Sequence, residues 1–404
     1  MALLLPLTAA IAIGAERSEA VEVPVVESNA AFCFDLYHAL RERQGNLFFS
    51  PYSVSVALAM TRAGAAGETA SQMDAVLHLP AEGVAAGHRE LARQLEPPLV
   101  SEIGEDGTRE IPAYELNLAN ALWGQQGMAF RKPFLTLLEK DFGAPLSRVD
   151  FGEPGEARER INDWVEEQTR QRIRNIVPEG QPTADTRLAL ANAIHLKAPW
   201  EEPFKTGRTV EAPFRTALGE QVTAHFMHQT KSLGYTGTDE VQVLSLPYRD
   251  GRMSMVILLP RQEDGLQDLE ARLAPERLSS WLSALRPTRV HVTFPRFEFE
   301  SSFDLTGTLA AMGMPDAFDS ERADFSKMSE VELFIGLVMH KAFVAVDEEG
   351  TEAAAATAVM MALAAAPPRE TIEFRADHPF LFLIRHRDTA AILFLGRLAN
   401  PTGS

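Results

Sequence analysis

The chain has little of what many binding and catalytic sites are built from. It holds one cysteine in 404 residues, Cys33, which excludes an intramolecular disulfide and any zinc site with several cysteines. Because Cys33 lies between Phe32 and Phe34, we expect it to be a small core residue. An Asn-x-Ser/Thr glycosylation acceptor is also missing, since Asn400 is followed by Pro401.

Catalytic motifs are absent as well. There is no nucleophile elbow, no His-Glu-x-x-His and no Gly-rich loop ending in Lys-Ser/Thr. His225 and His228 are close in sequence, but strand geometry suits them poorly as joint ligands. His195 and His340 lie within apolar stretches, where hydrogen-bonded core histidines are the simpler interpretation. We therefore expect a protein that is not an enzyme, with no metal and no cofactor.

Positive charge is scarce. The 38 lysines and arginines against 56 acidic residues leave a formal net charge of -18, which argues against nucleic acid and acidic surfaces as main partners. Arg170, Arg172 and Arg174 cluster locally, but acidic residues surround them. A solvated helix face is the preferred interpretation, so a heparin-type polyanion is not an expected partner.

Long apolar runs are missing except at the N-terminus. Residues 1–14 are apolar and run into Glu16 and Arg17, with Ala10-Ile11-Ala12 near a potential cleavage point. This resembles a secretory signal, although its basic n-region is missing. We expect residues 1–20 to be a signal or an unstructured segment and the protein to be secreted into the extracellular space. No other segment could span a bilayer.

Periodicity predicts helices in the first part of the chain and strands in the rest, which is typical of an α+β fold rather than alternating βαβ units. Residues 21–404 are expected to form one domain. The expected helices are 29–43, 51–63, 68–79, 87–95, 132–142, 156–177, 265–273, 275–285 and 305–312. The expected strands are 114–123, 187–196, 221–230, 241–247, 252–259, 289–300, 331–339, 371–374, 380–385 and 390–398. Residues 97–112 are polar and contain glycine, which predicts an exposed loop.

One stretch, residues 344–368, stands out. It begins as a strand, turns at Gly350, continues as a run of small residues and ends at Pro367 and Pro368. Alanine is the best helix former, so composition alone is compatible with a helix or with a flexible linker. The run lies between two β-rich stretches, however. We therefore weigh a third interpretation, a mobile loop whose residues could also serve as a strand.

Five segments of the chain stand out together: NLFFSPYS at 46–53, LANAIHLKAPW at 190–200, EEGTEAAAAT at 348–357, DHPFLF at 377–382 and ILFLGR at 392–397. They resemble the serpins, a family of serine protease inhibitors, and the resemblance covers about residues 29–401. The fold that this resemblance implies is a large mixed central sheet plus smaller sheets, with a cluster of helices and an exposed reactive-centre loop at about 347–368. His378 departs from the family's usual arginine, and the 97–112 loop looks longer than usual.

The resemblance implies a suicide substrate, in which a protease cuts the loop and the loop then inserts into the main sheet as a strand. Loop insertion of this kind is an established property of serpins, as a case of strand addition and of strain release. The resemblance also implies three groups of residues. The hinge is Glu348, Gly350, Thr351, Glu352, Ala353, Ala354, Ala355, Ala356 and Thr357; the breach cluster is Trp200, Arg296 and Glu348; the shutter cluster is Ser50, Ser53, Asn192 and His340.

Counted from Glu348, the loop spacing that is usual in serpins places the cleaved bond at Ala364–Ala365. Alanine fits a small apolar pocket, so the expected partner is an elastase-like serine protease, bound covalently by a monomer. Leu363 or Met361 would instead suit chymotrypsin-like or subtilisin-like enzymes, and a cysteine-protease inhibitor or a non-inhibitory serpin also stays open. The flanking subsite residues are Met360, Met361, Ala362, Leu363 and Ala366.

Overall fold

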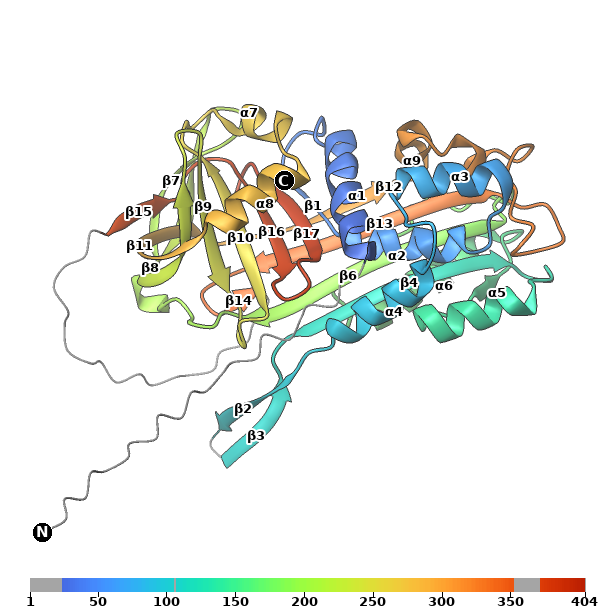
Figure 1. The fold of residues 1–404 in the computed structure, drawn as a ribbon, viewed down its shortest axis with the longest axis horizontal. Helices are drawn as coiled ribbons and strands as arrows, with labels where there is room; N and C mark the ends of the chain where they lie inside the picture. The colour runs from blue at the N-terminus through green and yellow to red at the C-terminus, as the bar shows by residue number, and fades with distance from the viewer. Residues whose placement is uncertain (1–23, 105–106, 352–370, 404) are drawn as a thin grey trace, which may run out of the picture.

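The computed structural model describes residues 24–104, 107–351 and 371–403, and the following account concerns those ranges. In this part of the chain, no helix is long and apolar enough to cross a membrane. Figure 1 shows an elongated molecule, with one sheet along its length and a second sheet at the left end. Most of the first helices lie toward the right end. The predicted α+β class is confirmed.

The helices begin where the sequence provides start signals. At α2, the Ser50 side chain accepts a hydrogen bond from the Ser53 N–H at 3.1 Å, and Pro51 occupies the first turn, as such capping requires. The helical elements are α1 (Pro24–Leu40), α2 (Pro51–Arg62), α3 (Gly67–Val76), α4 (Val84–Gln94), α5 (Lys132–Leu137), η1 (Leu138–Phe142), α6 (Pro154–Gln168), η2 (Thr206–Arg208), α7 (Leu266–Ala271), α8 (Pro275–Ala284), α9 (Thr306–Met312) and η3 (Pro315–Phe318).

The sheet along the length, here called the main sheet, has six strands. Its central strands β13 and β6 are parallel, whereas β14 is antiparallel to both. In order across the sheet, the strands are β12 (Phe297–Asp304), β13 (Ile335–Val346), β14 (Gly350–Thr351), β6 (Leu188–Pro199), β4 (Glu115–Gln125) and β5 (Ser147–Val149).

The second sheet has nine strands, with β7 (Val210–Arg215) paired only to β8. A separate hairpin, β2 (Leu99–Gly104) with β3 (Gly107–Pro112), projects from the body in Figure 1. The remaining strands of the second sheet, in order, are β1 (Leu47–Phe49), β17 (Ile392–Leu398), β16 (Phe380–His386), β10 (Met253–Pro260), β9 (Val241–Pro247), β8 (Gln221–Gly237), β11 (Arg286–Pro295) and β15 (Ile372–Arg375).

The two faces of the main sheet pack against different helices. On β6, Leu190 and Ile194 join the large core that includes α1 and α2. Ala189, Ala191 and Ala193 point the other way and pack in a smaller core with α6. This alternation follows from the period of two along a strand. Cys33 is fully buried in the large core, as predicted.

Four of the predicted elements need correction. Residues 289–300 form two strands of different sheets, β11 and β12, rather than one. Residues 97–112 contain the β2–β3 hairpin rather than only a loop. The helix expected to reach residue 177 ends at Gln168, and three residues with positive φ follow it, Arg170, Gln171 and Asn175. The strand expected at 331–339 starts later and continues to Val346.

Candidate functional site

The candidate site is the end of the main sheet where the chain leaves β13. Three expected hinge residues, Glu348, Gly350 and Thr351, are described there. The cleaved bond Ala364–Ala365, the subsite residues Met360, Met361, Ala362, Leu363 and Ala366, and the hinge residues Glu352, Ala353, Ala354, Ala355, Ala356 and Thr357 lie outside the described residues.

The start of the hinge already occupies a strand position in the main sheet. β14 lies between β6 and β13: Gly350 pairs with Pro199, and Thr351 pairs with both Ala198 and Val346. All pairings of β14 are antiparallel. The chain therefore turns back after β13 and enters the gap between the two central strands with at least two residues.

Beyond β14 the gap is closed. β13 and β6 pair directly from Ile335↔Leu188 to Ala342↔Ile194, in parallel. A strand that continued β14 would have to separate these pairs, and it would then run antiparallel to both of its neighbours. Antiparallel pairs are slightly more stable per residue than parallel ones, so such an exchange is favourable in hydrogen bonding.

A tight turn joins β13 to β14. The Asp347 side chain accepts hydrogen bonds from the N–H groups of Glu349 (2.9 Å) and Gly350 (3.2 Å), an Asx-type turn. Gly350 has φ +154°, and a Cβ there would lie 2.2 Å from the carbonyl oxygen of Ala198. Only glycine can therefore approach β6 so closely at this position.

Trp200 fastens this turn to the end of β6. Its indole N–H donates to the Asp347 carbonyl at 3.0 Å, and its backbone N–H donates to the Glu349 carbonyl at 2.8 Å. The indole stacks on the ring of Tyr248, with centroids 4.6 Å apart and planes 8° apart. Both rings are buried, so the turn rests on a rigid aromatic pair.

The breach cluster residues meet at Glu348. This side chain is 5% exposed and lies 3.6 Å from the guanidinium of Arg296, which is about half exposed. Glu348 also accepts a hydrogen bond from the hydroxyl of Thr209, a residue that the sequence interpretation missed. Its backbone carbonyl accepts from the Phe204 N–H at 2.8 Å. The expected pairing of Glu348 with Arg296 near Trp200 is thus present.

Thr351 makes a second contact that the sequence interpretation missed. Its hydroxyl lies 2.7 Å from the hydroxyl of Tyr248, and the two residues are 2% and 0% exposed. Burial raises the pKa of the Tyr248 phenol well above its ordinary value, so this phenol stays neutral and keeps its proton. Thr351, the first residue of β14 that carries a side chain, therefore has a polar partner inside the protein.

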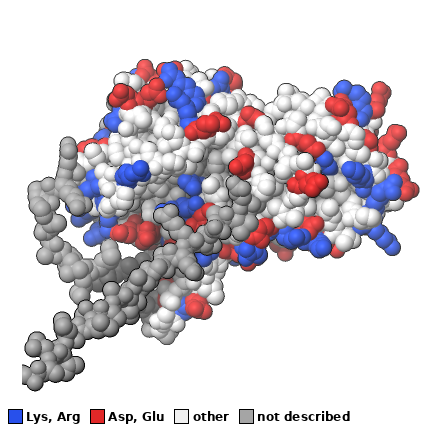
Figure 2. All heavy atoms as spheres, viewed as in Figure 1, with Lys and Arg blue, Asp and Glu red and all other residues white. Residues whose placement is uncertain are grey.

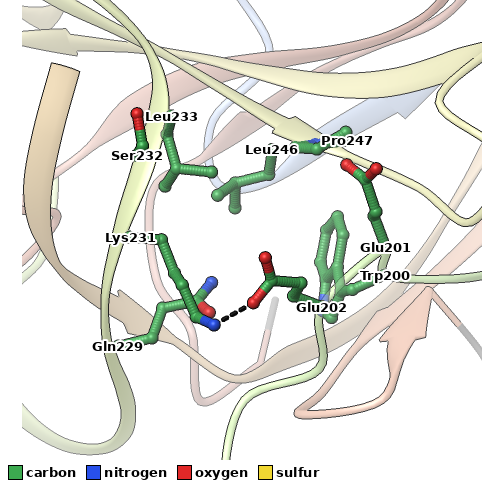
Figure 3. Close-up of a pocket in the computed structure, with 9 residues that line it drawn as sticks. All are labelled: Trp200, Glu201, Glu202, Gln229, Lys231, Ser232, Leu233, Leu246 and Pro247. Atoms are coloured by element: carbon green, nitrogen blue, oxygen red, sulfur yellow. Dashed lines mark hydrogen bonds and ion pairs between the residues drawn. The ribbon is translucent and has the colours of Figure 1, made fainter. Parts of the chain in front are cut away.

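A small pocket lies beside Trp200 (Figure 3). Its volume is about 50 Å³, room for a few water molecules. Figure 3 shows the ion pair of Glu202 and Lys231 across its lower side. Gln229 also lines it, and its buried amide oxygen has no protein partner. The pocket is thus small and has polar lining residues, and the charges of Glu202 and Lys231 offset each other within it.

The shutter cluster lies in the middle of the main sheet, between β6, β13 and the start of α2. Asn192 donates to the Ser53 hydroxyl at 2.7 Å, and its amide oxygen pairs with Nδ1 of His340. Nε2 of His340 accepts from the Ser50 N–H at 3.0 Å, while the Ser50 hydroxyl donates to the Leu393 carbonyl at 2.6 Å. The four expected residues therefore form one network that links both central strands to α2.

This network fixes the protonation state of His340. Because Nε2 accepts a hydrogen bond, the ring proton lies on Nδ1, which donates to Asn192. Burial is complete and lowers the pKa of His340 to about 3, and the hydrogen bond to Asn192 only partly offsets this effect. His340 is therefore neutral at physiological pH and acts as both donor and acceptor.

Asn120 of β4 is a further member that the sequence interpretation missed. Its amide oxygen accepts from the Ser53 hydroxyl at 2.8 Å and from the Asn192 amide. The sequence contained a signal for this role. Asn120 is two positions from Leu118 and from Leu122, so on a strand it shares their apolar face. A polar residue on a buried face needs a partner.

The remaining candidates have ordinary structural roles. Arg170 pairs with Glu115, and Arg174 lies 3.0 Å from Glu166. Figure 2 shows basic and acidic side chains mixed over the visible face, without a broad basic area. In the described part of the chain, no group of three or more His, Cys, Asp or Glu residues could hold a metal ion.

Comparisons with known proteins agree with this geometry. The family model described as "Serpin (serine protease inhibitor)" matches residues 27–401. The chain is 42% identical to a leukocyte elastase inhibitor of Xenopus laevis over 382 residues, covering 92% of this chain and 97% of that one. It is also 42% identical to a leukocyte elastase inhibitor of Sus scrofa, with 93% and 98% coverage. Uncleaved ovalbumin matches with a TM-score of 0.81, 30% identity, and coverage of 93% and 100%.

Proposed function

Because the chain belongs to the serpin family of serine protease inhibitors, we propose that it traps an elastase-like serine protease as a suicide substrate. It is a protease inhibitor and not an enzyme. The target's serine oxygen attacks the carbonyl of Ala364 and forms an ester. The Ala364–Ala365 peptide bond breaks, and the amine of Ala365 takes a proton and leaves with the C-terminal piece. The freed loop then inserts into the main sheet before water hydrolyses the ester.

One observation carries this proposal: Thr351 already lies between β6 and β13, antiparallel to both. Insertion therefore has a start point that exists before cleavage. The segment from Thr351 to Ala364 has about fourteen residues, and at roughly 3.3 Å per residue it would form a strand of about 45 Å. Each added backbone hydrogen bond contributes a net ~0.5–1.5 kcal/mol, and we expect the sum over the strand to supply the free energy that distorts a bound protease.

The side chains of the loop suit this insertion. With a period of two, Thr351, Ala353, Ala355, Thr357, Val359 and Met361 share one face, and none of them is charged. Thr351 is 2% exposed, which fits a face that becomes buried. Glu352 belongs to the other set, which would face solvent. Small side chains also limit steric obstruction as the strands separate.

The choice of target rests on Ala364. A small apolar residue at the cleaved bond fits a small apolar pocket, and relatives with about 42% identity carry the name leukocyte elastase inhibitor. Cleavage after Leu363 or Met361 would select chymotrypsin-like or subtilisin-like proteases instead.

The proposal includes a monomeric inhibitor, a covalent complex and secretion directed by residues 1–20, with residues 21–404 as one serpin domain. We further propose that the breach cluster controls loop entry and the shutter cluster controls strand separation.

The test is to incubate the protein with elastase and run denaturing electrophoresis. A stable adduct, together with a released peptide that starts at Ala365, is the expected result. Elastase with a blocked active-site serine serves as the control and should give no adduct. Ala364→Arg should transfer adduct formation to trypsin and abolish it with elastase. Complete cleavage of the wild-type chain without any adduct would contradict the inhibitory mechanism.

A further inference from the structure

The contact between Tyr248 and Thr351 joins a fixed element to the element that must move. Their hydroxyl oxygens are 2.7 Å apart in a site from which solvent is excluded. Tyr248 follows β9, whereas Thr351 is the last described residue before the proposed cleavage loop. The two residues are 103 positions apart in the chain, so the contact exists only in the folded protein.

Tyr248 is held in place independently of the loop. Its backbone N–H donates to the Met253 carbonyl at 3.0 Å, and it forms an isolated bridge with Trp200. Its ring stacks on the Trp200 indole at a centroid distance of 4.6 Å. The phenol hydroxyl is therefore a fixed reference point at the mouth of the gap between β6 and β13.

The orientation of Thr351, the first side chain in β14, decides the register of every residue after it. A shift by one position would turn Glu352 toward the face that Thr351 now occupies, since side chains alternate along a strand. A charge would then have to be buried, at a large cost in free energy. A side-chain contact that holds Thr351 in one orientation excludes that shift at the earliest step.

We propose that Tyr248 is a positioning residue for inhibition, which holds Thr351 in register so that insertion starts immediately after the loop is cut. This inference rests on the proposed function. Insertion competes with hydrolysis of the ester. A hinge that starts outside the sheet inserts more slowly, so a larger share of the ester is hydrolysed before the protease is trapped. Tyr248 therefore influences how many cleavage events end in a trapped protease, and not how fast the protease binds the loop.

The test uses single hydroxyl deletions in the full-length protein. Tyr248→Phe keeps the ring stacked on Trp200, and Thr351→Val keeps the side-chain shape. Each should raise the number of inhibitor molecules consumed per elastase inactivated by about two- to fivefold, the effect expected of roughly one net hydrogen bond. The rate constant for loop cleavage should stay unchanged. The double variant should be no worse than the single ones, because both remove the same contact.

Two controls separate this role from general stability. Thr351→Ser retains a hydroxyl and should restore a value close to that of the wild-type protein. Tyr235→Phe removes a different phenol contact, 3.1 Å from Gln242, and should leave the consumption of inhibitor unchanged. An unchanged value in both Tyr248→Phe and Thr351→Val, with normal adducts from the wild-type chain, would overturn the inference alone. Failure of the wild-type chain to form adducts would instead overturn the proposed function.

Discussion

His340 on β13 accepts the backbone N–H of Ser50 through Nε2, at a distance of 3.0 Å. This contact exists only while the imidazole is neutral, because a protonated ring has no acceptor nitrogen. The central strand that must separate from β6 is thus linked to the first residue before α2 by a proton-sensitive hydrogen bond.

We predict that the free energy of unfolding falls as the pH drops from about 6.5 toward 3, partly because of His340. In this window the unfolded chain, with an ordinary histidine pKa, binds a proton that the folded chain excludes, since its pKa is lowered to about 3. Between pH 7 and pH 5 the loss from this group is about 2 kcal/mol. Urea unfolding at the two pH values measures it.

His340→Asn should remove this part of the pH dependence. Part of the dependence should persist, because burial also lowers the pKa of His88, to about 4. The matched control is His225→Asn, which replaces a histidine whose side chain is 59% exposed and should retain the full effect. Equal pH dependence in all three proteins would contradict the assignment.

The elements of this fold were largely predictable where apolar periodicity is regular, and the errors have physical causes. In residues 289–300 the apolar positions change parity, from Val290, Val292 and Phe294 to Phe297 and Phe299. At Arg296 the buried side chains therefore change from even-numbered to odd-numbered positions. This is the point where the chain leaves β11 in the second sheet and enters β12 in the main sheet. Among the described side chains of the 97–112 hairpin none is buried, so apolar periodicity did not reveal it. Its sequence does contain Asp106-Gly107, a dipeptide typical of hairpin turns.

Some residues of the candidate site were predictable from the sequence, and others were not. Trp200, Glu348 and Arg296 were expected from the family resemblance, and the structure brings them together. Thr209 and Tyr248 contact the hinge across 139 and 103 positions of the chain. No local pattern marks either residue, because a polar side chain next to a turn has many ordinary uses. The two contacts follow from the pairing of β14 with β6, which places the hinge beside Thr209 and Tyr248.

Gly350→Ala should displace the start of the hinge from the main sheet. The added Cβ would lie 2.2 Å from the Ala198 carbonyl oxygen, at a φ of +154° that disfavours side chains. We expect faster hydrogen exchange of the amides at the end of β6 and a larger consumption of inhibitor per protease. Gly155→Ala is the matched control, since its Cβ would meet nothing within 4 Å. Unchanged exchange in Gly350→Ala would contradict the close approach.

Arg296→Ala should destabilise the protein by about 1–2 kcal/mol. It leaves the Glu348 carboxylate buried without its cation, and this cost is reduced because Arg296 itself is half exposed. Urea unfolding gives the value. Adding Glu348→Gln should recover part of the loss, because it removes the buried carboxylate charge at position 348. Arg93→Ala, which breaks an exposed pair with Glu90, should leave the stability nearly unchanged.

Thr351→Arg should convert the inhibitor into a substrate. Thr351 is 2% exposed between β6 and β13, so a guanidinium there would have to be buried at the first step of insertion. The loop should still be cut, but the ester should hydrolyse before the strand enters. Denaturing electrophoresis with elastase should then show the cleaved chain in place of the adduct.

The control for that variant places an arginine where no insertion takes place, with a change in net charge of +2 instead of +1. Glu373→Arg lies on β15, after the loop, at an exposed position, and should still form the adduct. Its association rate with elastase is compared with that of Thr351→Arg, so that any general effect of positive charge on encounter is separated from the effect on insertion. Full trapping of elastase by Thr351→Arg, at the wild-type consumption of inhibitor, would mean that Thr351 does not enter the sheet as its pairing with Ala198 and Val346 implies.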